Sequence, residues 1–396
     1  MDTPRPLAGI TVLDLTQIYN GPYATFLLAA GGAEVIKIEP PGGEHLRRRA
    51  DGGFVLPFAA LGAGKRSLRL DLKTEAGRDL LRRLAAKADV LVENFAPGVM
   101  DRLGLGAEVL RAENPRLIYA ASSGYGSDGP YRDYPAMDLT VQAMAGFMSI
   151  TGMADGPPLK AGPAVSDFLA GIHLYGAIVT ALFERERTGV ARTVEVSMLE
   201  ANLFPLLSAM SLLKPGDPPP RRVGNRHGGL SLCPHNVYPC ADGFIAIIIG
   251  NEGQWHGLLR ALGRQAAGED PRFRTVRERC AHMDLVDAMV GEWTAPHPKQ
   301  RLFEMLLAER VPCAPVRTLD EVAADPHLLG RGALERVEHP RYGPITVPHS
   351  PLRLGGLPVE AYAPPGPLGA EGRAVLAEML GMDDAALDAL EAEGVI

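Results

Sequence analysis

Short apolar runs alternate with longer amphipathic stretches in the first half of the chain. β-Branched and apolar residues at 10–15, 34–39, 90–93 and 117–121 predict four strands. The stretches between these runs carry helical periodicity. Strands that alternate with helices in this way predict a parallel sheet with helices packed on its faces, the α/β class.

Helices are predicted where apolar residues recur every three or four positions. Thr74 suits a helix N-cap, and Leu80, Leu81 and Leu84 after it fall on one face. A second periodic stretch starts at Asp167 and runs to about Arg187. Further expected elements are a helix after Gly21–Pro22, an extended piece at 68–72, a strand at 194–196 with a helix from Ser197, a strand at 244–249, an extended segment at 344–354 and a helix at about 369–390.

Polar side chains follow the predicted parallel strands. Asp14, Glu39, Asn94 and Ser122 each lie near the end of one of them. Open parallel sheets bind their ligands at the carboxyl ends of the strands. We therefore expect the functional site at this edge of the sheet.

The pattern changes at residue 213. Residues 213–224 are rich in Pro, Gly and Arg and predict a linker. A smaller domain is expected at about 225–320, because a Gly/Pro-rich loop there leads into an apolar strand and further helical segments.

Composition and charge limit the classes of function that the protein can have. Lys and Arg number 40 against 47 Asp and Glu, a formal net charge of -7, which disfavours general nucleic-acid binding. Four cysteines without a CxxC pair indicate neither a disulfide framework nor a metal site. The first residues lack a basic region followed by an apolar stretch, and no run of about 18 apolar residues occurs, so we expect a cytoplasmic protein without signal peptide or membrane span.

Two glycine motifs resemble nucleotide sites but fail on context. Gly124–Gly129 has the GxGxxG spacing after a strand, but Pro130 and Pro135 predict a loop where a dinucleotide fold needs a helix. Lys65 follows a glycine pair as in a phosphate-binding loop, but Ala59 and Arg66 occupy positions where that motif needs Gly and Ser or Thr. A nicotinamide oxidoreductase is therefore disfavoured.

An ordered set of segments spanning nearly the whole chain resembles the class III CoA-transferase family, also called CaiB/BaiF. The segments are Leu7–Thr16, Gly21–Pro22, Gly32–Pro40, Lys65–Lys73, Glu93–Gly104, Gly124–Gly126, Asp138–Gly146, Ser166–Asp167 with Gly171, Arg187–Gly189, Arg222–His227 and Val311–Val316. Each segment alone is a weak signal, and their order along the chain makes the resemblance specific.

The resemblance implies a fold and an assembly. Family members have a large nucleotide-fold-like domain built from both chain ends, here 1–212 and 321–396, and a smaller α+β domain, here 225–320. Two subunits interlock into a homodimer. The expected substrates are an acyl-CoA and a free carboxylate, with coenzyme A as cosubstrate, no tightly bound cofactor and no metal.

Asp167 aligns with the catalytic aspartate of the family. From the residues alone, Ser166–Asp167 before a periodic helix reads as an N-cap. The resemblance adds a nucleophile that attacks the acyl-CoA carbonyl. The two readings are compatible, because a helix N-terminus would keep Asp167 ionised.

Other site residues are implied by matching positions. Gln17 and the backbone N–H groups of Gly228 and Gly229 are candidate oxyanion donors, although a plain turn accounts equally for the glycine pair. Asp138 is expected to support the surroundings of Asp167. The residues expected to bind CoA are Lys73, Asn94, Phe95, Arg102 and Arg47. For Lys73 and Arg102 the alternative is a solvated surface charge.

The main alternative is a 2-methylacyl-CoA racemase of the same family. Racemases use a His at the position of Met137, paired with an acid that Glu252 matches. Methionine cannot carry a proton, which favours the transferase. Resemblance also suggests short dicarboxylates, with succinyl-CoA as donor. Arg47, Arg48, Arg222 and Arg226 are candidates to hold the free carboxylate, or else CoA phosphates or solvent.

Overall fold

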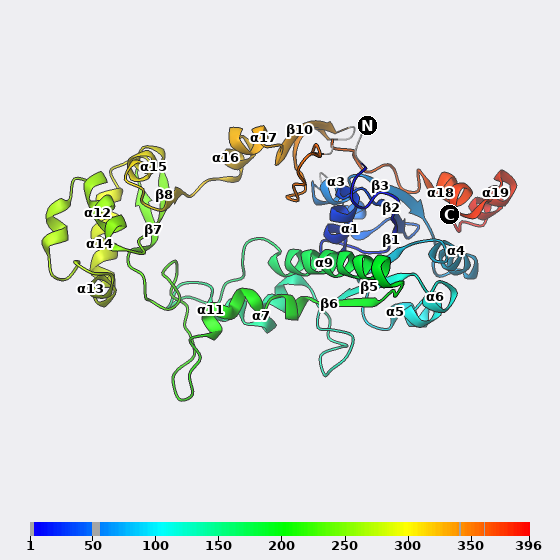
Figure 1. The fold of residues 1–396 in the computed structure, drawn as a ribbon, viewed down its shortest axis with the longest axis horizontal. Coiled ribbons are helices and arrows are strands. Elements are labelled where there is room, and N and C mark those ends of the chain that lie inside the picture. Colours follow the sequence, from blue (N-terminus) through cyan, green and yellow to red (C-terminus); the bar gives the residue numbers. More distant parts are fainter. Residues whose placement is uncertain (1–3, 50–55, 340–341, 360) are drawn as a thin grey trace. The chain divides into compact units, whose positions relative to one another are not determined.

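The computed structural model describes residues 4–49, 56–339, 342–359 and 361–396. Packing divides the chain into two compact units (Figure 1), which are described separately. The first unit comprises 1–145, 163–203 and 323–396, and the second comprises 146–162 and 204–322. The domain bounds expected from the sequence stay predictions.

A six-stranded parallel sheet forms the centre of the first unit, as the strand pattern predicts. Its order is β3-β2-β1-β4-β5-β6. The strands are β1 (Thr11–Asp14), β2 (Glu34–Glu39), β3 (Lys65–Arg69), β4 (Val90–Glu93), β5 (Ile118–Ser123) and β6 (Thr193–Ser197). The chain reverses its direction of travel across the sheet between β1 and β4, and such a switch point is where doubly wound sheets bind ligands.

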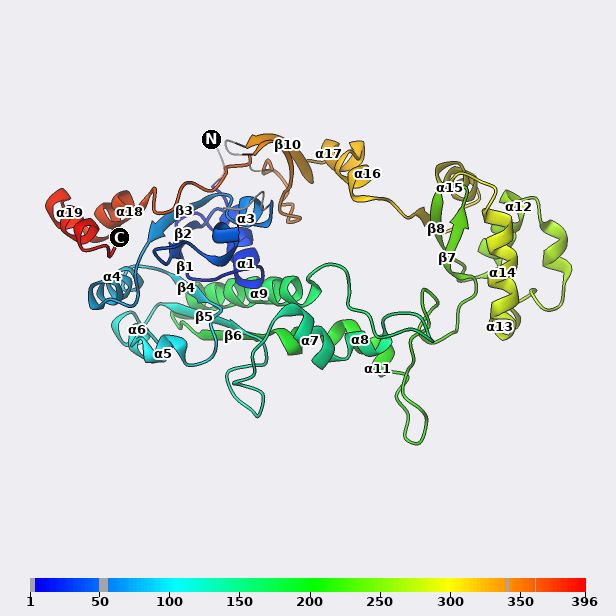
Figure 2. The same cartoon turned by 180° about the vertical axis from the view of Figure 1, so that it is seen from behind.

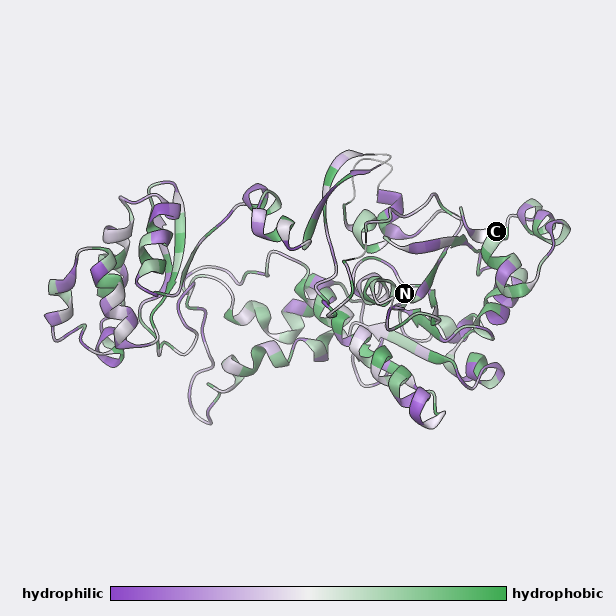
Figure 3. Cartoon of the chain, turned by 45° about the horizontal axis from the view of Figure 1, so that its top comes forward, coloured by the Kyte–Doolittle hydropathy of each residue, from purple (hydrophilic) through white to green (hydrophobic). Residues whose placement is uncertain are grey.

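Helices cover both faces of this sheet, so its strands are apolar on both sides. Leu13 and Ile36 face a core shared with α4 (Glu75–Ala85), α18 (Gly372–Leu380) and α19 (Asp384–Ala392). Val12 and Val35 face the opposite core, shared with α1 (Asn20–Ala30) and α9 (Val165–Thr188). Figure 2 shows the sheet from behind, and Figure 3 colours its strands by hydropathy.

The remaining elements of the first unit are shorter. They are α2 (His45–Arg49), α3 (Leu56–Leu61), α5 (Val99–Arg102), α6 (Ala107–Glu113), α7 (Asp138–Ala145), α10 (Met198–Ala201), α17 (Pro326–Gly330) and the antiparallel pair β10 (Leu334–His339) and β11 (Gly343–Pro348).

Some element bounds differ from those expected. The extended piece at 68–72 lies earlier, as β3, and the extended segment at 344–354 contains a strand only to Pro348. The C-terminal helix is two helices, because Gly381 adopts a left-handed conformation (φ 68°) that ends α18. The cap of α4 is as predicted: the Thr74 side chain accepts a hydrogen bond from the Gly77 N–H.

The second unit has a three-stranded antiparallel sheet in the order β7-β8-β9. Its core surrounds the fully buried Trp255, over which the buried guanidinium of Arg279 stacks at 4.8 Å. Its elements are α8 (Phe147–Ile150), η2 (Phe204–Leu206), α11 (Leu207–Met210), β7 (His235–Cys240), β8 (Gly243–Ile248), α12 (Glu252–Ala261), η3 (Gln265–Glu269), α13 (Val276–Ala281), α14 (Met283–Thr294), α15 (Lys299–Ala308), β9 (Cys313–Pro315) and, at its boundary, α16 (Leu319–Ala323).

Among the residues that the structure describes, one helix, α9, is long and apolar enough to cross a membrane by length and composition. Its buried residues, among them Ala170, Leu174 and Ile178, pack against the sheet and α1, as in the core helix of a globular unit. Other apolar residues of α9 are exposed, including Phe168, Ile172 and Phe183.

Candidate active site

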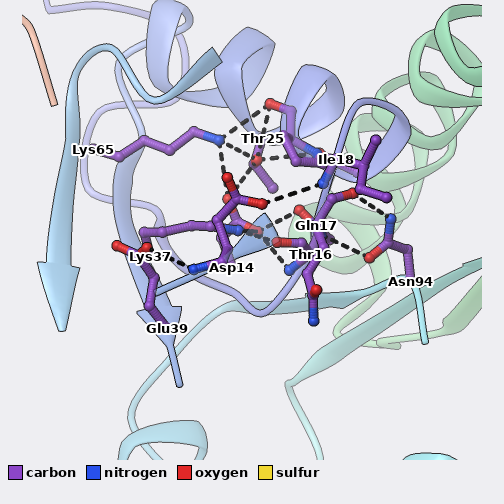
Figure 4. A network of polar contacts seen from close by, with 12 residues as sticks. Asp14, Thr16, Gln17, Ile18, Thr25, Lys37, Glu39, Lys65 and Asn94 are labelled. Carbon is purple, nitrogen blue, oxygen red and sulfur yellow. Dashed lines mark hydrogen bonds and ion pairs between the residues drawn. The ribbon is translucent and has the colours of Figure 1, made fainter. Parts of the chain in front are cut away.

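A buried polar network joins β1, β2 and β3: Asp14 ends β1, Lys37 lies within β2 and Lys65 begins β3 (Figure 4). Asp14 is fully buried and pairs with the Nζ atoms of Lys37 at 3.1 Å and Lys65 at 3.0 Å. It also accepts hydrogen bonds from the hydroxyls of Thr16 and Thr25. Burial alone would raise the pKa of Asp14, but the two ammonium groups and the hydroxyls outweigh it and hold that pKa well below its usual range.

Periodicity alone does not find the lysines of this network. Lys37 stands beside Asp14 in the parallel register of β1 and β2. The signal is the charge itself, because a lysine inside an otherwise apolar strand needs a buried acid as its partner. Burial also lowers the pKa of Lys65 to about 8.

The helix that carries Asp167 begins two residues before it. Helix α9 starts at Val165, so Asp167 is in the first turn and is not the N-cap that its position suggested. Asp138 fills the capping role from a distance: its Oδ1 accepts the Ser166 N–H at 2.9 Å. Its Oδ2 accepts from Gln142 at 2.6 Å. Asp138 thus fixes the start of the helix on which Asp167 sits.

Two effects oppose the stabilisation of the Asp167 anion that is expected from the helix N-terminus. Burial first, and the negative charge of Asp138 second, raise the pKa of Asp167 to about 7. A buried carboxylate with few compensating groups is basic and weakly solvated. At and above pH 7 these properties make it a better nucleophile.

The structure brings the Gln17 segment next to the Asp167 helix. A Cβ built on Gly171 of α9 would lie only 2.5 Å from the Asn20 carbonyl oxygen, so the two elements are in close backbone contact. The rings of Tyr19 and Phe168 stack with centroids 5.9 Å apart. Gln17 and Asp167 therefore belong to one region of the first unit.

Three of the residues expected to bind CoA lie in loops or at helix ends of the same unit. Phe95 follows β4, and its N–H donates to the Glu93 carboxylate at 2.8 Å. Arg102 ends α5 and Lys73 precedes α4; both are exposed, and neither forms an ion pair with the described residues. Their side chains are accessible to a ligand.

Glu93 was not singled out by its sequence position. It is buried at the end of β4, and the Tyr119 hydroxyl donates to it at 3.3 Å. Burial raises the pKa of Glu93 to about 7. The sequence signal that could have identified Glu93 is a carboxyl group at the end of a buried strand.

Arg47 has a different environment from the one expected for a phosphate ligand. Its guanidinium forms a fork on Glu39, with bonds of 2.8 and 2.7 Å, and donates to the Gly366 carbonyl at 2.9 Å. It also covers the Phe58 ring. Since Glu39 is fully buried, Arg47 neutralises an internal charge. We therefore do not assign Arg47 to CoA.

The other candidate arginines for a free carboxylate are also largely engaged. Arg226 pairs with Asp284 and Asp287 at 2.7 Å each. Arg222 donates to the carbonyls of Met153 and Gly156. Arg48 is exposed, and its Nη2 lies 3.1 Å from His45 Nδ1.

Gly228 and Gly229 lie in the second unit. They are exposed and occupy a turn closed by the hydrogen bond from the Leu230 N–H to the His227 carbonyl. This is the turn that the glycine pair suggested. Their role as oxyanion donors stays a prediction.

The racemase alternative finds no acid–base pair. Met137 is exposed before α7. The Glu252 carboxylate is taken up by Arg279 at 2.7 Å and by the Val276 N–H at 2.8 Å. Glu252 therefore links the elements of the second unit.

The GxGxxG motif does not lead into a helix. Gly124–Gly129 leads into turns, and the next helix among the described residues is α7, which starts at Asp138. Among the residues the structure describes, no group of three His, Cys, Asp or Glu is placed to hold a metal ion.

Comparison with known proteins supports the resemblance. The model of CoA-transferase family III matches residues 7–372. The chain is 38% identical to a succinate–glutarate CoA-transferase from Agrobacterium fabrum, over 94% of this chain and 96% of that protein. It is 37% identical to a formyl-CoA:oxalate CoA-transferase from Streptomyces avermitilis, over 99% of this chain and 100% of that protein.

A solved structure agrees with both the sequence and the fold. The crystal structure of a CaiB/BaiF family protein from Brucella suis superposes with a TM-score of 0.86 and 33% identity, covering 95% of this chain and 100% of that chain. With the α/β sheet, the placement of Asp167 and the match across nearly the whole sequence, this chain belongs to CoA-transferase family III.

Proposed function

We propose that the protein moves coenzyme A from a short dicarboxylyl-CoA to a free carboxylate, with Asp167 as the nucleophile. The observation that carries the proposal is the state of Asp167. It lies in the first turn of α9, burial and Asp138 raise its pKa to about 7, and Gln17 lies in the adjoining segment. A basic, partly desolvated carboxylate suits attack on a thioester.

The reaction conserves the energy of the thioester at each step. An Asp167 oxygen attacks the acyl-CoA carbonyl and forms a C–O bond. The C–S bond breaks, CoA departs as a thiolate, and the product on the enzyme is an aspartyl–acyl anhydride. The thiolate attacks the Asp167 carbonyl, which forms an aspartyl-CoA thioester and frees the first acid. The acceptor carboxylate displaces the thiolate to give a second anhydride. Attack of the thiolate on its acyl carbonyl releases the new acyl-CoA and restores Asp167.

Each attack creates a negative oxygen that preorganised donors stabilise. The Gln17 side-chain amide is the proposed donor in the first unit. The Gly228–Gly229 turn is a predicted second source of N–H groups. Water must be excluded, because it would hydrolyse either anhydride.

CoA is proposed to bind through Phe95, Arg102 and Lys73. Two exposed cations suit the phosphates, and Phe95 offers an apolar surface. Replacing Arg102 or Lys73 by Ala should raise KM for the acyl-CoA, with the largest effect at low salt. Exposed Lys87, beyond the other end of α4, provides the control for a general charge effect. Equal changes in all three variants would contradict this assignment.

Dicarboxylates are proposed as substrates because the relatives named above act on succinate, glutarate and oxalate. Incubation with succinyl-CoA and a panel of acids, followed by mass analysis of the new CoA esters, tests this. We expect glutarate or oxalate to be used and butyrate to be excluded. Efficient use of monocarboxylates would overturn the substrate class but not the CoA transfer.

A covalent route predicts a trap. Hydroxylamine added during turnover should convert Asp167 to a hydroxamate, and Asp167→Asn should remain folded but inactive. An unmodified Asp167 peptide from an active reaction, or normal turnover by Asp167→Ala, would end the mechanism proposed here.

We also propose that the protein is a homodimer. The large apolar side chains exposed on α9 need a partner surface to leave water, and Phe183 is 62% exposed. A second copy of the chain is the partner that the family resemblance suggests.

A further inference from the structure

Residues 15–19 join β1 to α1, and one of them holds an uncommon backbone conformation. Ile18, directly after Gln17, has φ 67°. A β-branched residue in the left-handed region costs on the order of 1–3 kcal/mol and persists only when the surroundings impose it. The surroundings of Gln17, the proposed catalytic residue beside Ile18, therefore impose this conformation.

The main chain of this turn is held by side chains at each residue (Figure 4). The Thr16 N–H donates to Asp14 at 2.9 Å, and the Thr16 carbonyl accepts from the Lys37 ammonium. The Ile18 N–H reaches the Glu44 carboxylate at 3.4 Å. Since Asp14, Lys37 and Glu44 are buried, these contacts hold the turn firmly.

Gln17, at the centre of the turn, is held by Asn94. The Asn94 Oδ1 accepts the Gln17 N–H at 2.8 Å, and its Nδ2 donates to the Gln17 carbonyl at 2.9 Å. The side-chain amide of Asn94 thus forms both hydrogen bonds that a neighbouring β-strand would form with the main chain of Gln17. The same Nδ2 lies 3.5 Å from Asn20 Oδ1, and Asn20 donates to the Ser122 hydroxyl at 3.1 Å, which steadies the plane of the Asn94 amide.

We infer that Asn94 is a positioning residue for Gln17, and not the CoA ligand that its place after β4 suggests. Both ends of its amide are used on the Gln17 main chain. With the main chain fixed on both sides and Ile18 strained, the Gln17 side chain leaves the turn in one direction. Its amide is then in place before an oxyanion forms, and no reorganisation is needed during the reaction.

This inference rests on the role proposed for Gln17, but kinetic measurements on variants can test the two roles separately. Asn94→Ala should lower kcat by about 10²-fold, the scale of effect expected when a catalytic group is misplaced by about 1 Å. KM for the acyl-CoA should change little. In a double-mutant cycle, Asn94→Ala should cause little further loss in a Gln17→Ala background, because both changes remove the same function.

Asn114→Ala is the matched control. Asn114 donates its side-chain amide to two backbone carbonyls, those of Ala85 and Ala88, at 2.9 Å each. Its loss should lower the melting temperature as much as Asn94→Ala does while leaving kcat at the wild-type value. Asn94→Asp, which keeps the acceptor for the Gln17 N–H and loses the donor, gives an intermediate kcat and serves if the alanine variant does not fold.

Three outcomes are distinct. A raised KM with unchanged kcat in Asn94→Ala would make Asn94 a CoA ligand and overturn the inference. Losses that multiply in the double variant would also overturn it, because the two residues would then act independently. Wild-type turnover by Gln17→Ala would instead remove the proposed role of Gln17 itself.

Discussion

The pKa values of two aspartates in the first unit shift in opposite directions. Asp14 is fully buried and faces two ammonium groups, and its pKa lies well below the usual range. Asp167 is half-buried beside the carboxylate of Asp138, and its pKa rises to about 7. When different environments push the pKa values of two carboxyl groups apart, the two groups can have different roles: here Asp14 is structural and Asp167 is the proposed nucleophile.

The pKa of Asp167 predicts the pH dependence of the reaction. Below pH 7 the carboxyl group is protonated and cannot attack, so kcat/KM for the acyl-CoA should rise through about pH 7 and level off above it. A pH series of initial rates measures this. A flat profile from pH 5 to 8 would contradict the pKa shift.

Asp138→Asn should move that acid limb to lower pH, by roughly one pH unit, because a like charge beside Asp167 is removed. The amide retains an oxygen that can accept the Ser166 N–H. Asp138→Ala also removes this cap and should lower stability by about 1 kcal/mol more than the asparagine variant. The same acid limb in wild type and Asp138→Asn would show that Asp138 does not influence the nucleophile.

Stability should respond to Asp167 with the opposite sign from an ordinary salt-bridged acid. Its folded pKa of about 7 exceeds the unfolded value of 3.8, so the folded state binds the proton more tightly and loses stability as pH rises from about 4 to 7. Asp167→Asn should therefore be more stable than wild type at pH 8, by roughly 1–3 kcal/mol, and equal to it at pH 4. Urea unfolding at both pH values tests this.

At the scale of elements, the contact of α1 with α9 sets how closely Gln17 approaches the nucleophile's helix. Gly171 permits the contact, because any side chain there would meet the Asn20 carbonyl. Gly176 is on the same helix, and a Cβ there would meet nothing within 4 Å. The two glycines offer a comparison within one helix.

Gly171→Ala should destabilise the protein by roughly 1–3 kcal/mol and lower kcat, because α1 must move away. Gly176→Ala should stabilise it by about 0.5–1 kcal/mol through helix propensity, with activity unchanged. Thermal unfolding and initial rates measure both. Equal behaviour of the two variants would refute the close packing.

The Asp14 network ties β1, β2, β3 and α1 together. Asp14→Asn leaves the buried ammonium groups of Lys37 and Lys65 without a countercharge, so we expect a loss of roughly 3–5 kcal/mol. Asp384 pairs with Arg373 but is 92% exposed, and Asp384→Asn should cost less than about 1 kcal/mol. Denaturant midpoints compare the two, and similar losses would contradict the importance given to burial.

At the scale of the whole molecule, exposed apolar side chains argue for assembly. Phe183 in the first unit and Phe204 in the second are 62% and 79% exposed. Side chains of this size are hidden in stable homodimers.

We expect a dimer at micromolar concentration by sedimentation, with no exchange of subunits between tagged and untagged samples if the chains interlock. Phe204→Glu should weaken the dimer, whereas Thr188→Glu, at the exposed end of α9, should not. A stable, active monomer would rule out the proposed assembly.

The sequence by itself determined the parallel α/β class of the first unit, most of its strands and the family. Central strands that are buried on both faces are largely apolar. Local turn chemistry at Thr74 and at Gly189, which ends α9 in a left-handed conformation, specifies where helices begin and end. Such signals are short-range, so a reading of neighbouring residues recovers them.

Only the tertiary structure decided which polar groups meet. Asp138 caps α9 from 28 residues away, Asn94 holds Gln17 across 77, and Arg47 reaches the Gly366 carbonyl across 319. Burial first, and the charge of Asp138 second, raise the pKa of Asp167. Hydrogen bonding and desolvation depend on distances in space, and a residue pattern does not contain these distances until the chain has folded.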